Sequence, residues 1–114
     1  VLAGTAQQDA AGRLGARVAC EIFADRAYNP DATLVDRRLP GAVIHDPAIA
    51  ADRVLRMVRA GAILPEDGAP IPARIDTVCL HGDTPGAVEI ARAVRAALTG
   101  AGVAVALFDG LPLV

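Results

Sequence analysis

The sequence predicts an α/β fold in which parallel strands alternate with crossover helices. Short apolar runs that alternate with polar residues are separated by longer stretches whose apolar residues recur every three or four positions. The chain has 114 residues, of which 54% are hydrophobic and 3% aromatic, so it can form one domain with a core of small side chains. Polar residues that can move protons follow the strand patterns, at the edge where α/β folds bind ligands.

The first half predicts two strands and one short helix before a long loop. Residues 1–4 match the tail of a strand and its turn, and residues 6–14 match a short helix. Residues 17–24 alternate as a strand whose apolar face carries Val18, Cys20, Ile22 and Ala24. Residues 25–46 contain turn formers around a brief extended stretch, and loops of this length in compact domains are usually functional.

A helix is predicted to begin at Asp46-Pro47, because aspartate caps helices and proline suits the first turn. Gly61 is the expected C-terminal stop, and the core-facing stripe consists of Ile49, Val54, Leu55 and Val58. Residues 63–74 carry three prolines and are predicted to be a surface connection or a small ribbon.

The last part predicts a strand, a helix and a further strand. Residues 76–81 form the strand, and Asp83 or Thr84 is expected to cap the helix. The apolar stripe of that helix consists of Val88, Ala91, Val94, Ala97 and Leu98. Residues 103–108 are expected to be the next strand. Four strands with helices on one side make an incomplete barrel, whose complete form takes about 250 residues. Residues 1–114 are therefore expected to be a single domain that forms part of a larger, irregular (β/α) TIM-like barrel.

Composition argues against several classes of partner. The net charge of −2 gives no electrostatic reason to expect nucleic acid. No apolar run approaches the roughly 20 residues of a membrane helix, and no export signal is visible. The spacing of Cys20 and Cys79 is neither a metal-ligand pattern nor a disulfide framework, which indicates reduced thiols in a cytoplasmic protein. All 11 basic residues are arginine, so arginine, histidine or backbone N–H groups must make any anion contact.

The stretch His81-Gly82-Asp83 is the strongest indication of chemistry, because it lies between a strand's end and a helix's start. Histidine with aspartate two residues on is a reasonable acid/base pair. The structural alternative is that Asp83 caps the helix while His81 bonds to backbone. A metal site would have to gather His81, Asp83 and Glu21, and their spacing does not require one.

Glu21, in the middle of an apolar strand, either points into a site or lies on a solvated face. Asp25, Arg26 and Tyr28 follow it at the strand's carboxyl end. Arg26 could hold a carboxylate or phosphate through a bidentate fork, or form an ion pair with Asp25 or Glu21 that pins the loop.

Arg37 and Arg38 precede a fixed turn in the long loop. They could form a lid over an anionic ligand, or remain a solvated charge pair. His45 stands beside the capping Asp46, and packing at the helix start is its expected role.

Three segments in this order resemble the LamB/YcsF family, and the resemblance runs over nearly all of the chain. The segments are Val18-Ala19-Cys20-Glu21-Ile22-Phe23-Ala24-Asp25-Arg26-Ala27-Tyr28, Pro40-Gly41-Ala42-Val43-Ile44-His45-Asp46 and Val78-Cys79-Leu80-His81-Gly82-Asp83-Thr84-Pro85-Gly86-Ala87. The resemblance implies the C-terminal half of a barrel of about 250 residues, similar to polysaccharide deacetylases. The family's N-terminal half carries further motifs, including Lys-Pro-His, that this chain lacks, so a partial chain is expected.

The resemblance implies the A subunit of an ATP-dependent 5-oxoprolinase, which opens 5-oxo-L-proline to L-glutamate. The implied ligands are 5-oxoproline and ATP as co-substrate, and the implied partners are the B and C subunits of 5-oxoprolinase. Catalytic roles then pass to Glu21 or Asp83 as base and His81 as acid or oxyanion stabiliser. Asp25, Arg26 and Arg37 are expected to bind substrate. No metal is assigned, and an oligomer is possible.

Two alternatives remain open at this point. One is a metal-dependent, carbohydrate deacetylase-like hydrolase, which shares the barrel style. The other is a non-catalytic scaffold subunit that only stabilises its partners in a multi-subunit amidohydrolase.

Overall fold

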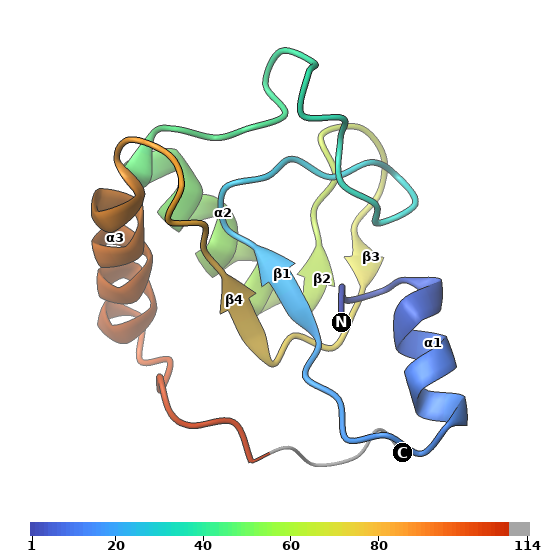
Figure 1. The fold of residues 1–114 in the computed structure, drawn as a ribbon. Helices are drawn as coiled ribbons and strands as arrows, with labels where there is room; N and C mark the ends of the chain where they lie inside the picture. Colours follow the sequence, from blue (N-terminus) through green and yellow to red (C-terminus); the bar gives the residue numbers. More distant parts are fainter. Residues whose placement is uncertain (110–114) are drawn as a thin grey trace.

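A computed structural model describes residues 1–109 of the chain, in which helices and strands alternate around a small parallel sheet (Figure 1). The elements in chain order are α1 (Ala6–Arg13), β1 (Glu21–Phe23), α2 (Pro47–Ala60), β2 (Ala62–Ile63), β3 (Ile71–Pro72), β4 (Thr77–Cys79) and α3 (Ala87–Gly100). None of the described helices is both long enough and apolar enough to cross a membrane.

Strands β1 and β4 pair in parallel, with Phe23 opposite Cys79 and Glu21 opposite Thr77. Leu2 adds an isolated parallel bridge to Glu21, as expected for the tail of a strand. Strands β2 and β3 form an antiparallel ribbon, which confirms the small ribbon predicted between residues 63 and 74. The mixed α/β class with parallel strands and helices is therefore confirmed.

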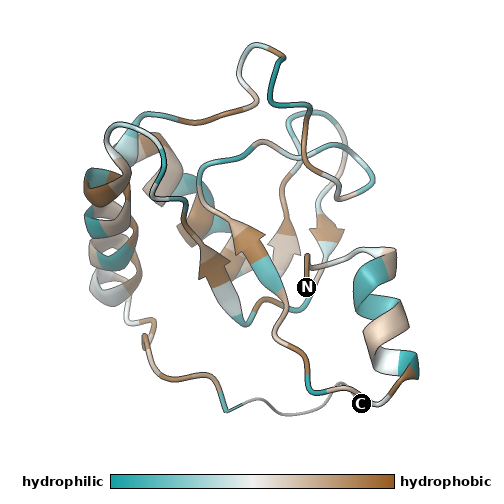
Figure 2. Cartoon of the chain, viewed as in Figure 1, coloured by the Kyte–Doolittle hydropathy of each residue, from teal (hydrophilic) through white to brown (hydrophobic). Residues whose placement is uncertain are grey.

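The core lies between the sheet and the two long helices, where Figure 2 shows apolar segments in brown. The predicted apolar face of the strand at residues 17–24 is buried. It packs in one cluster with Val54 and Met57 of α2 and with Ile90 and Val94 of α3. The strand itself is shorter than predicted, because only Glu21–Phe23 pair with β4. Along β1 burial alternates, and Glu21 and Phe23 stay half-exposed on the face turned away from this core.

Helix α2 starts and ends as the sequence predicts. The Asp46 carboxylate accepts hydrogen bonds from the N–H groups of Ala48 and Ile49, and Gly61 ends the helix in the left-handed conformation at φ 58°. Ile49 was wrongly expected in the core, because the residue is 55% exposed. The buried contacts of the helix are instead made by Ala50, Ala51, Val54 and Met57.

Helix α3 begins later than predicted, at Ala87, after Gly86 in the left-handed conformation at φ 84°. Neither Asp83 nor Thr84 caps it with a side chain, so that expectation was wrong. The residues before it form a turn in which the N–H of Ala87 donates to the carbonyl of Thr84. Val88 is 56% exposed, and the buried stripe is Ile90, Val94 and Leu98.

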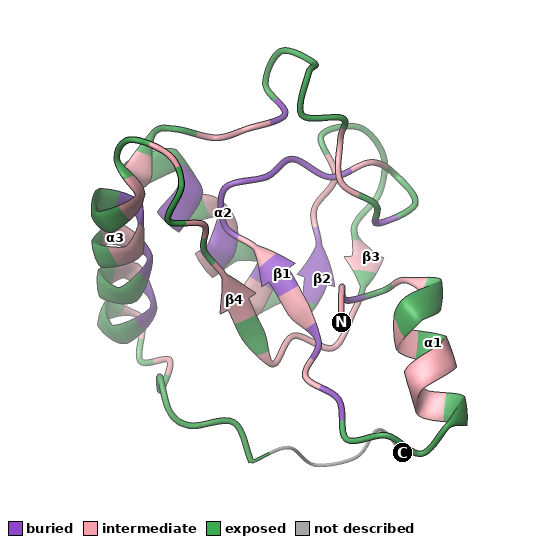
Figure 3. Ribbon diagram, viewed as in Figure 1, coloured by how far each residue is buried: buried purple, intermediate pink, exposed green. Residues whose placement is uncertain are grey.

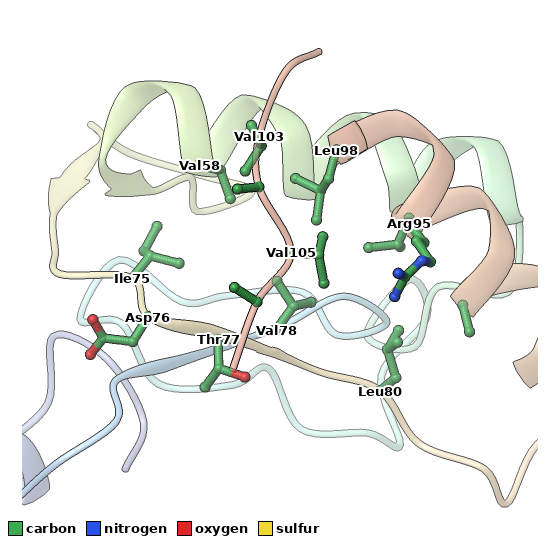
Figure 4. Close-up of a pocket in the computed structure, with 14 residues that line it drawn as sticks. Val58, Ile75, Asp76, Thr77, Val78, Leu80, Arg95, Leu98, Val103 and Val105 are labelled. Atoms are coloured by element: carbon green, nitrogen blue, oxygen red, sulfur yellow. The ribbon is translucent and has the colours of Figure 1, made fainter. Parts of the chain in front are cut away.

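The strand predicted at residues 103–108 is not formed, since no described residue from 101 to 109 belongs to a strand. This segment instead borders an apolar hollow of about 480 Å³ between β4 and α3 (Figure 4). Val78, Leu98 and Val105 turn towards its centre, and none of the predicted site residues lines it. The tail beyond residue 109 lies outside the described residues.

We predict that Asp46→Ala destabilises the chain by about 1 kcal/mol, because two N–H groups of α2 lose their acceptor. Urea denaturation followed by circular dichroism measures this loss. Asp52→Ala is the matched control. It removes a carboxylate from the same helix, and both Asp52 and its ion-pair partner Arg56 are exposed. Equal effects from the two substitutions would contradict the capping role.

Candidate active site

The loop that leaves β1 is buried, unlike most loops, and appears as the purple segment after β1 in Figure 3. The N–H of Phe23 donates to the hydroxyl of Tyr28 at 2.8 Å, which closes the loop on itself. The N–H of Ile44 donates to the carbonyl of Asp25 at 2.8 Å, so the far end of the long loop runs beside it. These bonds hold Asp25 and Arg26 at the carboxyl end of the strand.

Asp25 pairs with His81, which lies in the loop after the neighbouring strand β4. Both carboxylate oxygens of Asp25 lie 2.9 Å from Nδ1 of His81. Asp25 is only 4% exposed, and a buried carboxylate needs such a partner. The partner of His81 is therefore Asp25, and not Asp83 or the backbone as the sequence suggested.

This pairing determines which ring nitrogen of His81 is free. An ionised carboxylate only accepts hydrogen bonds, so Nδ1 carries the hydrogen and Nε2 of the neutral ring keeps a lone pair. The ring of Phe23 packs edge-on against the imidazole, with ring centroids 4.9 Å apart and an interplanar angle of 65°. A neutral His81 held in this way can act as a general base through Nε2.

Arg26 is a buried cation that makes no ion pair within residues 1–109, although it lies near Asp36, whose pKa is lowered mainly by hydrogen bonds from Arg38 and slightly by the charge of Arg26. Arg26 is 9% exposed, and its Nη2 donates to the carbonyl of Val35 at 2.8 Å. Nε is buried without any hydrogen-bond partner. Within residues 1–109 neither Asp25 nor Glu21 makes an ion pair with it, so the predicted alternative of a loop-pinning pair is not formed.

A hollow of about 360 Å³ brings these groups together at the strand ends. It is lined by Asp25, Arg26, Arg37, Leu39, Gly41, Val43, His45, His81, Asp83 and Thr84. Arg37 lines the hollow. Arg38 does not line it, and its guanidinium forms an ion pair with Asp36 through two nitrogens. The long loop thus contributes Arg37, and its far end contributes His45.

His45 is the site residue that the sequence interpretation missed. It was assigned to packing at the start of α2, but it is exposed and lines the same hollow as His81. His45 lies in the second of the three family motifs, but its place in the site depends on the pairing of residues 25–27 with residues 42–44, which the bridge between Arg26 and Val43 shows. That pairing is long-range and has no strong sequence pattern.

Glu21 does not line this hollow. It lies further back on β1, on the sheet face that it shares with Phe23 and Cys79. Its charge still affects Cys79 on that face. The pKa of the Cys79 thiol is raised mainly by burial, and then by the charges of Glu21 and Asp25. Within residues 1–109 no three histidine, cysteine or acidic residues are grouped as metal ligands would be.

Comparison with known proteins identifies the family. A LamB/YcsF family model matches residues 1–112. The chain belongs to the LamB/YcsF family. The 5-oxoprolinase A subunit of Ruegeria pomeroyi is 60% identical over 109 residues, covering 96% of this chain and 43% of the relative. The protein of the same name from Mycobacterium avium is 53% identical over 107 residues, covering 94% of this chain and 42% of the relative.

A solved structure, the crystal structure of the lactam utilization protein from Thermus thermophilus, shares the fold with a TM-score of 0.78. It is 46% identical, and the match covers 90% of this chain and 40% of that chain. The chain thus spans less than half the length of the relatives it matches. The family resemblance drawn from the three motifs is confirmed.

We predict that alkylation of Cys79 by iodoacetamide rises only above the pH of an ordinary thiol, about 8.5, because the raised pKa keeps it protonated below that. Glu21→Gln removes one of the charges responsible and should therefore lower the pH of half-maximal rate. Peptide mass mapping against pH measures both, and Glu89→Gln, in the first turn of α3, is the control. An unchanged profile in Glu21→Gln would contradict the electrostatic contact.

Proposed function

We propose that this chain supplies part of the active site of an ATP-dependent 5-oxoprolinase, which opens the ring of 5-oxo-L-proline to give L-glutamate. The names of the relatives support this reaction, since they are called the A subunit of 5-oxoprolinase. The name of the Thermus neighbour, a lactam utilization protein, agrees with a cyclic amide as substrate. The B and C subunits of the same enzyme are the partners we propose.

The observation that carries the proposal is Arg26, which lines the hollow, makes no ion pair within residues 1–109 and has a buried Nε without a hydrogen-bond partner. A buried guanidinium without a directly bonded counter-ion is unfavourable, and the more distant charge of Asp36 compensates it only in part, so a ligand that supplies negative charge is favoured there. The carboxylate of 5-oxoproline, or a phosphoryl group derived from ATP, meets that need as a negative charge bound in the hollow that Arg26 lines. Arg37 lines the same hollow and is proposed as a second contact with the anion.

The chemical difficulty is the stability of the ring amide, whose resonance resists attack by water. We propose that ATP phosphorylates the amide oxygen, which removes this resonance and makes the ring carbon electrophilic. His81, oriented by Asp25, moves the protons that ring opening requires. Asp83 borders the same hollow and is proposed as an additional proton-transfer group, while Glu21 acts from the sheet face behind it.

We propose that residues 1–114 are the C-terminal portion of an irregular (β/α) barrel. Helices α2 and α3 cover one face of the parallel pair β1–β4, while Glu21, Phe23 and Thr77 remain accessible on the other. In a closed barrel the helices lie outside and that second face lines the interior. The hollow at the carboxyl ends of the strands then lies at the mouth of the barrel, the usual place for a barrel active site.

We predict that the chain, joined to the upstream part of the Ruegeria pomeroyi relative and mixed with the B and C subunits, releases glutamate from 5-oxoproline only with ATP. Asp25→Asn should lower kcat by roughly 10²- to 10⁴-fold, because His81 loses the carboxylate that orients it. Asp52→Asn, on the exposed side of α2, serves as the control. An enzyme coupled to glutamate measures the rate, and a wild-type assembly that releases none would refute the proposed function.

We predict that Arg37→Ala raises KM about tenfold or more with a smaller change in kcat, because it removes a cation from the binding hollow. Arg38→Ala is the matched control, since it removes the neighbouring charge from an exposed pair with Asp36 outside the hollow. Initial rates at varied 5-oxoproline and varied ATP show which anion Arg37 binds. Equal effects of the two substitutions would exclude a specific role for Arg37.

A further inference from the structure

We propose that Cys79 is the nucleophile of the ring-opening reaction, with His81 as its general base and Asp25 as the group that orients the base. Sγ of Cys79 lies 3.8 Å from Nε2 of His81, within reach of an S–H···N hydrogen bond. Nδ1 of the same ring bonds to Asp25. This inference rests on the proposed function and names the atom that attacks the substrate.

The three groups have the order that nucleophilic catalysis requires. A nucleophile needs a base within hydrogen-bond reach, and the base needs a third group that holds it in the right tautomer. Because Asp25 occupies Nδ1, the lone pair of the neutral His81 ring is on Nε2, which faces the thiol. Phe23 packs against the ring and limits its rotation.

Cys79 is also placed where a substrate could reach it, in contrast to the other cysteine. Cys20 belongs to the core face of the strand and is fully buried, and it has no histidine beside it. Cys79 is half-buried on the other face of the parallel strand pair, where it is the pairing partner of Phe23. Its base, His81, lines the hollow that contains Arg26, so one histidine borders both the anion site and the thiol.

The thiol is protonated at rest. Burial and the charges of Glu21 and Asp25 raise its pKa, so the structure does not favour a preformed thiolate–imidazolium pair. Glu21 and Asp25 are the acidic groups whose charges act on the thiol, and His81 is the basic group in contact with it. The proton therefore moves to Nε2 only as sulfur bonds to carbon, in the manner of a serine nucleophile.

The chemistry balances with two waters. The thiol proton passes to His81 while sulfur attacks the phosphorylated ring carbon, and the carbon–oxygen bond breaks to release phosphate. Water adds to the carbon of the resulting cyclic thioimidate, and the carbon–nitrogen bond breaks as the nitrogen takes up protons, one of them from His81. This leaves a γ-glutamyl thioester on Cys79. A second water hydrolyses the thioester, which yields glutamate and restores the thiol.

The test is to trap the thioester in the active assembly with the B and C subunits. Acid quenching during turnover of labelled 5-oxoproline and ATP should leave label on the Cys79 peptide, with a mass increase equal to one 5-oxoproline molecule. Hydroxylamine should remove this label, because it cleaves thioesters. His81→Gln should abolish the labelling, since the thiol then has no base.

Substitution of the thiol gives the second readout. Cys79→Ala should lower kcat at least 100-fold and abolish labelling, and Cys79→Ser should retain only a small fraction of the rate. Cys20→Ala is the control, and it should keep both turnover and label within about twofold. Wild-type turnover without label on Cys79, or full turnover by Cys79→Ala, would overturn the nucleophile while leaving the proposed function intact. A wild-type assembly that releases no glutamate would overturn both.

Discussion

The hydrogen bonds between Asp25 and His81 are the interaction on which the site depends. Strands β1 and β4 are parallel with Phe23 opposite Cys79, so residues that follow each strand by the same offset meet at the sheet's edge. Asp25 and His81 each come two positions after that pair, and they are joined although 56 positions separate them in the chain. The register of one short strand pair thus brings the orienting carboxylate to the base, and packing of α2 and α3 against the sheet maintains that register.

The buried loop after β1 provides the rigidity that this pairing needs. A carboxylate that is nearly inaccessible to water is unfavourable without partners, and a mobile loop would let it return to solvent. Two bonds prevent this: the Phe23 N–H donates to Tyr28, and the Ile44 N–H donates to the carbonyl of Asp25. Burial also raises the pKa of the Tyr28 phenol, so the hydroxyl that accepts this bond stays neutral over the physiological range. Catalytic geometry and loop burial therefore depend on the same contacts.

Many local features of the fold were predictable from the sequence, although the cap expected at Asp83 or Thr84 is not formed, and the long-range features were not predictable. The cap at Asp46, the stop at Gly61 and the apolar face that includes Cys20 and Ile22 follow from neighbouring residues, and the structure has all of them. The partner of His81 depends instead on strand register, which a single sequence does not encode locally. The missing strand at residues 103–108 has the same cause, because an apolar run becomes a strand only where another strand pairs with it.

Under the proposed mechanism, the arrangement separates substrate binding from bond making and joins the two through one imidazole. Arg26 places positive charge in the hollow, and Cys79 places sulfur on the adjoining sheet face. His81 lines the hollow, and its Nε2 lies beside the sulfur of Cys79 on the sheet face. In the proposed reaction, a lactam whose carboxylate binds near Arg26 has its ring towards the histidine, so the group that receives the thiol proton is the same group that returns it to the leaving nitrogen. If this proposed mechanism holds, orientation of that single ring by Asp25 controls both halves of ring opening.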